Sequence, residues 1–178
     1  MKVRNNLEYK FYNFLANLKH ISKDSFVIDI GANIGDVTEF LYEKFEPTIY
    51  SYEPNISCYK FMLDRFRDKP KINLFNTAVS NFDGKSNLYF HKNSKGINDV
   101  KYIQGATLRP EKDSIDHKKK IEIECINIKN ILEEHKKIDL IKIDIEGSEY
   151  SIMPEIINYR DKINMVICET HGNPFGKK

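Results

Sequence analysis

Segments typical of strands and of helices alternate along most of the chain, and this alternation restricts its fold more than any other feature. Runs rich in apolar and β-branched residues occur at residues 26–30, 48–53, 72–79, 138–145 and 163–169. Segments with apolar residues at helical spacing separate most of them, at residues 35–45, 56–66, 128–135 and 148–158. This succession predicts an α/β domain in which crossover helices connect the strands of a parallel sheet.

The middle of the chain departs from this pattern. Residues 86–91 and 121–126 alternate apolar and polar side chains, as half-buried antiparallel strands do. Residues 93–120 lie between them and are polar without a clear period, so we expect a long loop there. A loop of this length is either a lid on the substrate side or a passive insertion. We interpret its lysine run, residues 118–120, as a solvated surface.

Length and composition favour one globular domain over all 178 residues. We expect an amphipathic helix and lead-in at residues 5–23 and a core at residues 24–173. The net charge of +2, from 28 basic and 26 acidic residues, gives no overall field that would favour nucleic acid. The sequence has no signal peptide and no apolar run near the length of about 18 residues that spans a membrane. Its three cysteines fit neither zinc nor redox spacing. We therefore expect a cytoplasmic protein without a membrane partner.

The stretch IDIGANIGDVT, residues 28–38, runs from a strand through a glycine turn into a helix. A nicotinamide-binding fingerprint aligned on Gly31 would need glycines at positions 33 and 36, which hold Asn33 and Asp36. These mismatches argue against a nucleotide-dependent oxidoreductase. Gly31 and Gly35 would still allow the backbone to approach a ligand closely.

Two acidic residues indicate which ligand the turn binds. An ionised Asp29 repels a pyrophosphate but suits S-adenosylmethionine, which carries an ammonium and a sulfonium and no phosphate. Glu53 ends the second strand, where folds of this class place a carboxylate that accepts the ribose hydroxyls. Together with the missing glycines, these positions favour a methyl donor over a nicotinamide.

A second group of polar residues lies in DLIKIDIEGSE, residues 139–149. If this stretch continues as a strand, its period of two places Lys142, Asp144 and Glu146 on one side. The carboxyl end of such a strand is where open α/β sheets bind ligands. Asp144 and Glu146 could orient or deprotonate an acceptor hydroxyl while Lys142 holds a carboxylate ionised. The alternative is a purely structural cluster of ion pairs.

His171 follows the last predicted strand, two residues after Glu169. Parallel strands end level with one another, so His171 could face the same crevice and act as a general base. Acidic and histidine side chains can also hold a divalent metal. We assign no metal ligands.

With these motifs in hand, residues 24–173 resemble the FkbM family of S-adenosylmethionine-dependent methyltransferases. The resemblance rests on VIDIGANIGDVT, SYEPN, TAVSNFDGKSNLYFH, DLIKIDIEGSE and ICETHG, which occur in this order. It implies a class I Rossmann-like methyltransferase fold, with a mainly parallel sheet and helices on both faces. Such folds add two further strands after the fifth, and the residues that follow Glu169 are too few for both, so we expect these C-terminal strands to be missing or shortened.

The resemblance also implies roles for individual positions. The methionine part of the cofactor would be lined by Asp29, Gly31, Asn33 and Gly35, and Thr38 is a further cofactor-binding candidate. Glu53 would bind the ribose, and Thr77 and Ala78 would lie near the adenine. The catalytic candidates are Lys142, Asp144, Glu146 and His171, and the resemblance does not settle which of Asp144, Glu146 and His171 is the base.

The function we expect is O-methylation of a hydroxyl group on a sugar, a glycan or a small metabolite. The rival is a catalytically inactive module of the same fold that binds the cofactor or serves as a scaffold. The shortened C-terminus would leave an edge strand uncovered, which favours pairing with a second copy of the chain.

Overall fold

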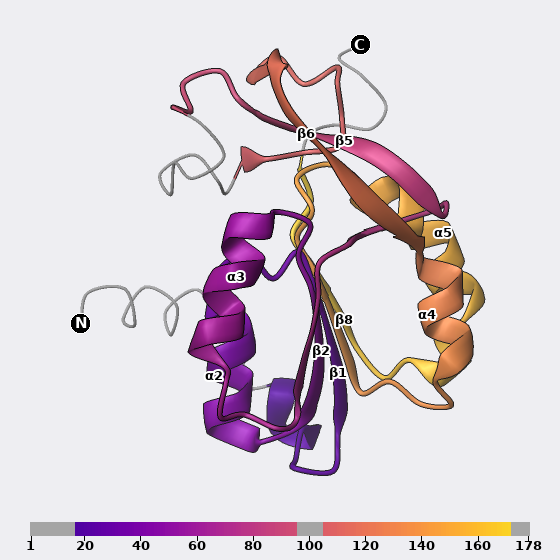
Figure 1. The fold of residues 1–178 in the computed structure, drawn as a ribbon. Helices are drawn as coiled ribbons and strands as arrows, with labels where there is room; N and C mark the ends of the chain where they lie inside the picture. The colour runs from indigo at the N-terminus through magenta and orange to yellow at the C-terminus, as the bar shows by residue number, and fades with distance from the viewer. Residues whose placement is uncertain (1–16, 96–104, 172–178) are drawn as a thin grey trace.

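The fold of the chain is α/β, built on a parallel sheet (Figure 1). The computed structural model describes residues 17–95 and 105–171. The five strands of this sheet, in the order β3-β2-β1-β7-β8, are β3 (Ile72–Phe75), β2 (Thr48–Tyr52), β1 (Phe26–Ile30), β7 (Leu140–Ile143) and β8 (Val166–Cys168). All four neighbouring pairs run parallel. The predicted Rossmann-like fold class is therefore confirmed.

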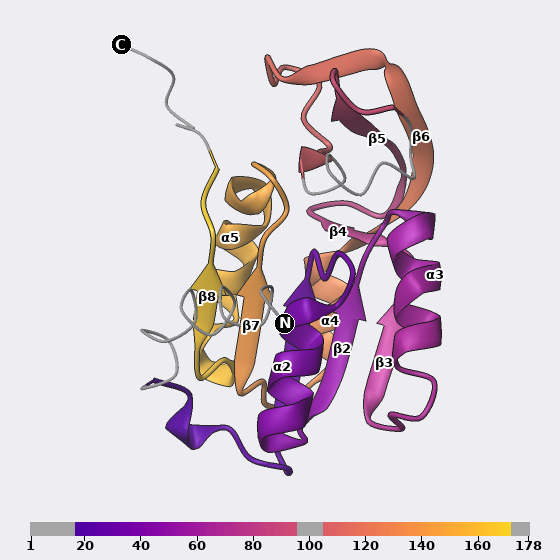
Figure 2. The same cartoon turned by 90° about the vertical axis from the view of Figure 1, so that its left-hand side faces the viewer.

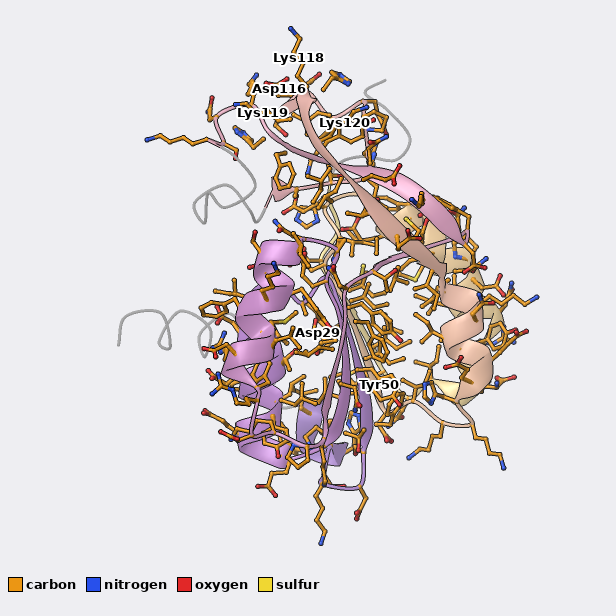
Figure 3. All side chains as sticks on the ribbon, in the orientation of Figure 1. Asp29, Tyr50, Asp116, Lys118, Lys119 and Lys120 are labelled. Carbon is orange, nitrogen blue, oxygen red and sulfur yellow. The ribbon has the colours of Figure 1, made fainter. Side chains whose placement is uncertain are left out.

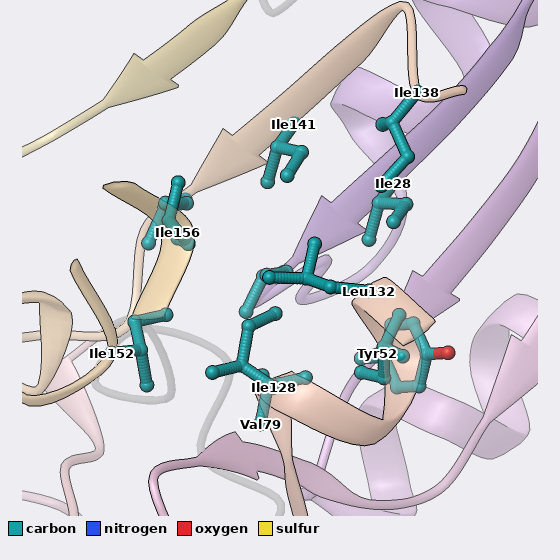
Figure 4. Packing of buried hydrophobic residues seen from close by; sticks show 12 residues of the cluster. Ile28, Tyr52, Val79, Ile128, Leu132, Ile138, Ile141, Ile152 and Ile156 are labelled. Carbon is teal, nitrogen blue, oxygen red and sulfur yellow. The ribbon is translucent and has the colours of Figure 1, made fainter. Parts of the chain in front are cut away.

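Helices cover both faces of the parallel sheet (Figure 1). They are α2 (Asp36–Phe45) and α3 (Ile56–Arg65) on one face, and α4 (Ile128–Glu134) and α5 (Glu149–Asn158) on the other. Side chains alternate along each strand, so Val27 packs with Leu41 of α2, whereas Ile28 packs in the cluster that contains α4 and α5. Figure 4 shows the second cluster, where Ile28 and Ile141 meet residues of both helices. Burial on both faces explains why these strands are almost continuously apolar.

The predicted third strand, residues 72–79, is in fact two strands in two sheets. Its first half is β3, and its second half joins a three-stranded sheet of order β4-β6-β5, made of β4 (Ala78–Ser80), β6 (Ile115–Asn127) and β5 (Gly84–His91). The chain changes direction at Asn76, whose Nδ2 donates hydrogen bonds to the carbonyl oxygens of Glu53 (2.9 Å) and Pro54 (3.0 Å). These bonds replace the ladder that a straight strand would have continued.

The second sheet extends beyond the carboxyl ends of the parallel strands (Figure 2). Its β5 and β6 pair antiparallel, as predicted. However, β6 begins at Ile115, opposite His91, so residues 115–120 of the predicted loop at 93–120 are strand. Residues 96–104 of that loop lie outside the described residues. Figure 3 shows Lys118, Lys119 and Lys120 at the far end of this ribbon.

The described residues begin and end close to the bounds of the predicted core. The amphipathic helix and lead-in expected at residues 5–23 fall mostly outside the described residues, which begin with a short 3-10 helix, Asn17–His20. Within the described part of the chain, β8 is one of the two outer strands of the parallel sheet, and β3 is the other. None of the helices that the structure describes is both long and apolar enough to span a bilayer.

Candidate functional site

A cavity of about 620 Å³ opens at the carboxyl ends of the parallel strands. Its volume is in the range of small-molecule binding sites. It lies where β1 has β2 on one side and β7 on the other, the position at which the strand order reverses and open α/β sheets bind ligands. Leu88 of β5 and residues 106–108, in the segment between β5 and β6, also line it. Of the twelve site residues predicted from the sequence, Gly31, Asn33, Glu53, Ala78, Lys142, Asp144, Glu146 and His171 line this cavity.

The glycine turn brings the ends of β1 and β7 into contact. Gly31 has φ +77°, and a Cβ at this position would clash with the carbonyl oxygen of Asp144. Asn33 follows with φ +54°, a left-handed conformation that asparagine tolerates better than most residues. Gly35 lies outside the lining, and a Cβ there would meet the Phe66 ring at 2.5 Å. Gly35 therefore serves the packing of α2 against α3.

Asp29 and Thr38 lie behind the turn, not in the cavity lining where we expected them. Asp29 is fully buried on the side of the sheet that faces α2, because it shares the orientation of Val27 (Figure 3). Thr38 Oγ1 donates a 2.7 Å hydrogen bond to Asp29 Oδ2. Lys142 Nζ lies 3.1 Å from Asp29 Oδ1 and donates a 2.8 Å hydrogen bond to the carbonyl oxygen of Gly31. Through Lys142, this buried ion pair is hydrogen-bonded to the backbone of the glycine turn.

Glu53 is a buried carboxylate at the end of β2 and is only 7% exposed. Its Oε2 accepts the backbone N–H of Asn33 at 2.9 Å, and its Oε1 accepts that of Asn55 at 2.7 Å. Burial raises the pKa of Glu53 to about 7, although both N–H donors and Lys142 oppose this shift. Of the two residues predicted to lie near the adenine, Ala78 lines the cavity. Thr77 does not, and its Oγ1 donates a hydrogen bond to the carbonyl oxygen of Glu124.

The loop after β7 presents Asp144 and Glu146 to the cavity. The strand ends at Ile143, and Glu146 has φ +54°, so this arrangement arises from a turn and not from the strand alternation that we predicted. Lys112 Nζ forms a 2.7 Å ion pair with Glu146 Oε2, and Thr107 Oγ1 donates to the carbonyl oxygen of Glu146 at 2.8 Å. The segment between β5 and β6 thus holds the loop in place.

His171 lies among four carboxylates at the ends of β7 and β8. Its Nδ1 is 2.9 Å from Glu149 Oε1, and Glu149 is only 1% exposed. Its Nε2 is 3.8 to 3.9 Å from carboxylate oxygens of Asp144, Glu146 and Glu169. Burial lowers the pKa of His171, but the hydrogen bond to Glu149 and the nearby carboxylates outweigh burial and raise it.

The same cluster has the donor set of a metal site. One ligand atom each from Asp144, Glu149 and His171 lie within 4.8 Å of one another, so these residues could hold a metal ion. Burial raises the pKa of Asp144, and the nearby Glu169 carboxylate raises it further. Lys142 and His171 act in the opposite direction.

Our sequence interpretation did not identify Glu149, Thr107 and Lys112. Glu149 belongs to the DIEGSE stretch, but an acidic residue in the first turn of a predicted helix is also what the helix dipole favours. Thr107 and Lys112 lie in a stretch without periodicity, so no signal distinguished them.

Comparison with known proteins gives two matches. The family model described as "Methyltransferase FkbM domain" matches residues 29–178. The protein named "Methyltransferase sdnD" from Sordaria araneosa is 21% identical over an alignment of 185 positions. This alignment covers 90% of this chain and 71% of that protein. The matched region contains every residue named above in the cavity lining.

Proposed function

Since the chain belongs to the FkbM methyltransferase family, we propose that it uses S-adenosylmethionine to methylate a hydroxyl group of a sugar, a glycan or a small metabolite. The observation that carries this proposal is one cavity with two kinds of wall. The glycine turn and Glu53 lie on one side of it, and Asp144, Glu146 and His171 lie on the other. The first wall suits a nucleoside, and the second suits a hydroxyl that must lose a proton.

The residues present fit S-adenosylmethionine better than a nucleotide diphosphate. Carboxylates of Glu53, Asp144, Glu146 and Glu169 line the cavity, and like charges disfavour a pyrophosphate there. When bound, S-adenosylmethionine supplies an electrophilic methyl group on a positively charged sulfur.

The chain would hold this cofactor through Glu53 and the turn. Each Glu53 oxygen accepts one backbone N–H, and an ionised carboxylate has about four acceptor positions in total. Glu53 can therefore also accept the two ribose hydroxyls. Gly31 and Asn33 would bring the backbone close to the methionine part, and Ala78 offers an apolar surface to the adenine.

On the other wall, Asp144, Glu146 and His171 can orient the acceptor hydroxyl and take its proton. Their negative charge disfavours an acceptor that carries a phosphate or carboxylate close to the reacting hydroxyl. A neutral polyol such as a sugar suits this wall better.

Isothermal titration with S-adenosylhomocysteine and with NADH tests the cofactor. We expect S-adenosylhomocysteine to bind one per chain and NADH not to bind. Glu53→Ala should weaken binding, whereas Glu122→Ala, an exposed change on β6, should not. Binding of NADH without S-adenosylhomocysteine would overturn the proposal.

Turnover is then measured as the formation of S-adenosylhomocysteine from S-adenosylmethionine in the presence of single acceptors. The acceptors are neutral sugars and glycosides, with sugar phosphates and uronic acids as matched anionic compounds. We expect turnover on neutral members only. Cofactor binding with no turnover on any hydroxylated acceptor would favour the inactive module instead.

A further inference from the structure

We propose that Glu149 is a positioning residue that makes His171 the general base of the methyl transfer, with Nε2 as the atom that takes the proton. This inference rests on the proposed function and deepens it, because the sequence left the base open among Asp144, Glu146 and His171. No role for Glu149 follows from the sequence motifs or from the comparisons.

The structure fixes Glu149 more tightly than any other acidic residue of the cluster. It is the first residue of α5, it is only 1% exposed, and its Oε1 accepts the backbone N–H groups of Ile145 at 3.3 Å and Gly147 at 3.1 Å. The same oxygen lies 2.9 Å from His171 Nδ1. Its second oxygen, Oε2, has no hydrogen-bond partner among the residues that the structure describes. A buried carboxylate that two backbone donors hold in place also fixes the orientation of the neighbouring imidazole.

This contact determines which nitrogen of His171 carries the proton. A carboxylate can only accept, so Nδ1 must donate, and in the neutral imidazole Nε2 is then the unprotonated atom. Nε2 is on the side of Asp144, Glu146 and Glu169 (3.8 to 3.9 Å), all of which line the cavity. A buried carboxylate that orients a histidine in this way is the arrangement by which many enzymes prepare a general base.

Glu146, in the loop after β7, is less suited to the same task. Glu146 is already paired with Lys112 at 2.7 Å, so one of its carboxylate oxygens is engaged. A general base works best when its pKa is near the working pH, which favours an imidazole over a carboxylate. Asp144 and Glu146 then stabilise the imidazolium that forms, since both lie within 4 Å of Nε2.

The proton and electron balance of the step is complete without a further reagent. The O–H bond of the acceptor breaks, and its proton goes to His171 Nε2. The electron pair stays on the oxygen, which bonds to the methyl carbon as the methyl–sulfur bond breaks and its pair returns to sulfur. The imidazolium later releases its proton to solvent.

Histidine NMR tests this proposal on the full-length chain without cofactor or acceptor. Two-bond ¹H–¹⁵N spectra of uniformly labelled protein distinguish the two neutral tautomers, and His171→Gln identifies the His171 signals among those of the five histidines. Above its pKa, we expect His171 to be protonated at Nδ1 and not at Nε2. The reverse tautomer would overturn the proposal, and this outcome requires no variant of Glu149 to fold.

Variants then separate the direct contact from the general field of the cluster. Glu149→Gln keeps the size of the side chain and removes its charge, so the pKa of His171 should fall by about one unit or more. Glu169→Gln is the matched control, because its carboxylate lies 3.8 Å from Nε2 but is 60% exposed. Its effect should be clearly smaller. Equal shifts in the two variants, or none in Glu149→Gln, would refute a special role for Glu149.

The cofactor titration is independent of this test. S-adenosylhomocysteine binding with the wrong tautomer would leave the methyltransferase proposal standing and remove His171 as the base. The expected tautomer without cofactor binding would do the opposite.

Discussion

The affinity of the cavity for S-adenosylhomocysteine should rise with pH because Glu53 must be ionised to accept both ribose hydroxyls. A neutral carboxyl has one O–H donor, and both Glu53 oxygens already face backbone N–H donors. With its pKa at about 7, Glu53 is ionised in about one molecule in eleven at pH 6 and in about ten in eleven at pH 8. If only the ionised form binds, the dissociation constant falls about tenfold over this range, which corresponds to about 1.4 kcal/mol.

The sign of the effect is opposite for the stability of the protein without ligand. The pKa of Glu53 is raised from 4.5 in the unfolded chain to about 7, so the folded protein binds the proton more tightly. This contribution to stability is fully present below pH 4.5 and is lost as the pH rises through 7. It amounts to about 3 kcal/mol. At neutral pH the ionised Glu53 that the ligand requires therefore lowers the stability of the protein without ligand. Binding of the ligand restores part of that stability.

Isothermal titration at pH 6, 7 and 8 measures the affinity. Other charged groups lie near the cavity as well: His171 and Asp144 both have raised pKa values, Glu146 and Glu169 line the same cavity, and Lys142 and Asp29 face Glu53 from the neighbouring strands. Glu53→Gln therefore serves as the reference, since it keeps these groups and removes the titration of Glu53. The pH dependence should flatten in this variant. A wild-type dissociation constant that stays within about twofold from pH 6 to 8 would refute the reasoning.

Two further predictions concern the glycine turn. Lys142→Met leaves Asp29 buried without its cation, and the free energy of unfolding in urea should fall by about 3 to 5 kcal/mol; a loss below about 1 kcal/mol would contradict the ion pair. Gly31→Ala should prevent accumulation of folded protein, because its Cβ would clash with the carbonyl oxygen of Asp144. Gly84→Ala is the matched control, since Gly84 also has a positive φ (+124°) but has open space around it, and it should cost only about 1 to 3 kcal/mol by thermal melting.

Much of the fold could be predicted because it depends on patterns that recur along the chain. Each parallel strand is a short apolar run, and each crossover helix has a 3.6-residue period, so element types and the parallel sheet follow directly. The division of residues 72–79 could not be predicted in this way. It depends on Asn76, whose side-chain amide bonds to two carbonyl oxygens of a different segment. A single asparagine inside an apolar run carries no such information by itself.

The candidate site was predictable in position but not in its internal arrangement. The ends of β1, β2, β7 and β8 had to meet at one edge, and the polar residues after them do line one cavity. Which way each side chain points depends on where its strand ends. Strand β7 ends at Ile143, two residues earlier than predicted, so Glu146 reaches the cavity from a left-handed turn. The contribution of Thr107 and Lys112 comes from an aperiodic segment and required the tertiary structure.

Asp29 shows most clearly how the structure changes the interpretation of a motif, and it supports a decisive test. An acidic residue next to a glycine turn suggested contact with the ammonium group of the cofactor. In the structure it is fully buried and bound to Thr38 and Lys142. Asp29→Asn keeps the size of the side chain and leaves Lys142 without its anion, so the free energy of unfolding should fall by about 3 kcal/mol or more.

The affinity of the folded Asp29→Asn variant for S-adenosylhomocysteine then distinguishes the two interpretations. If Asp29 only supports the turn, the dissociation constant measured well below the melting temperature should change less than about threefold. If Asp29 contacts the ammonium directly, loss of a buried charge-assisted hydrogen bond should weaken binding by about tenfold or more. In this variant Lys142 can still donate to the carbonyl oxygen of Gly31, and Thr38 Oγ1 can still donate to the side-chain oxygen at position 29, so we expect the smaller change. A tenfold loss with an unchanged thermal midpoint would return Asp29 to the binding surface.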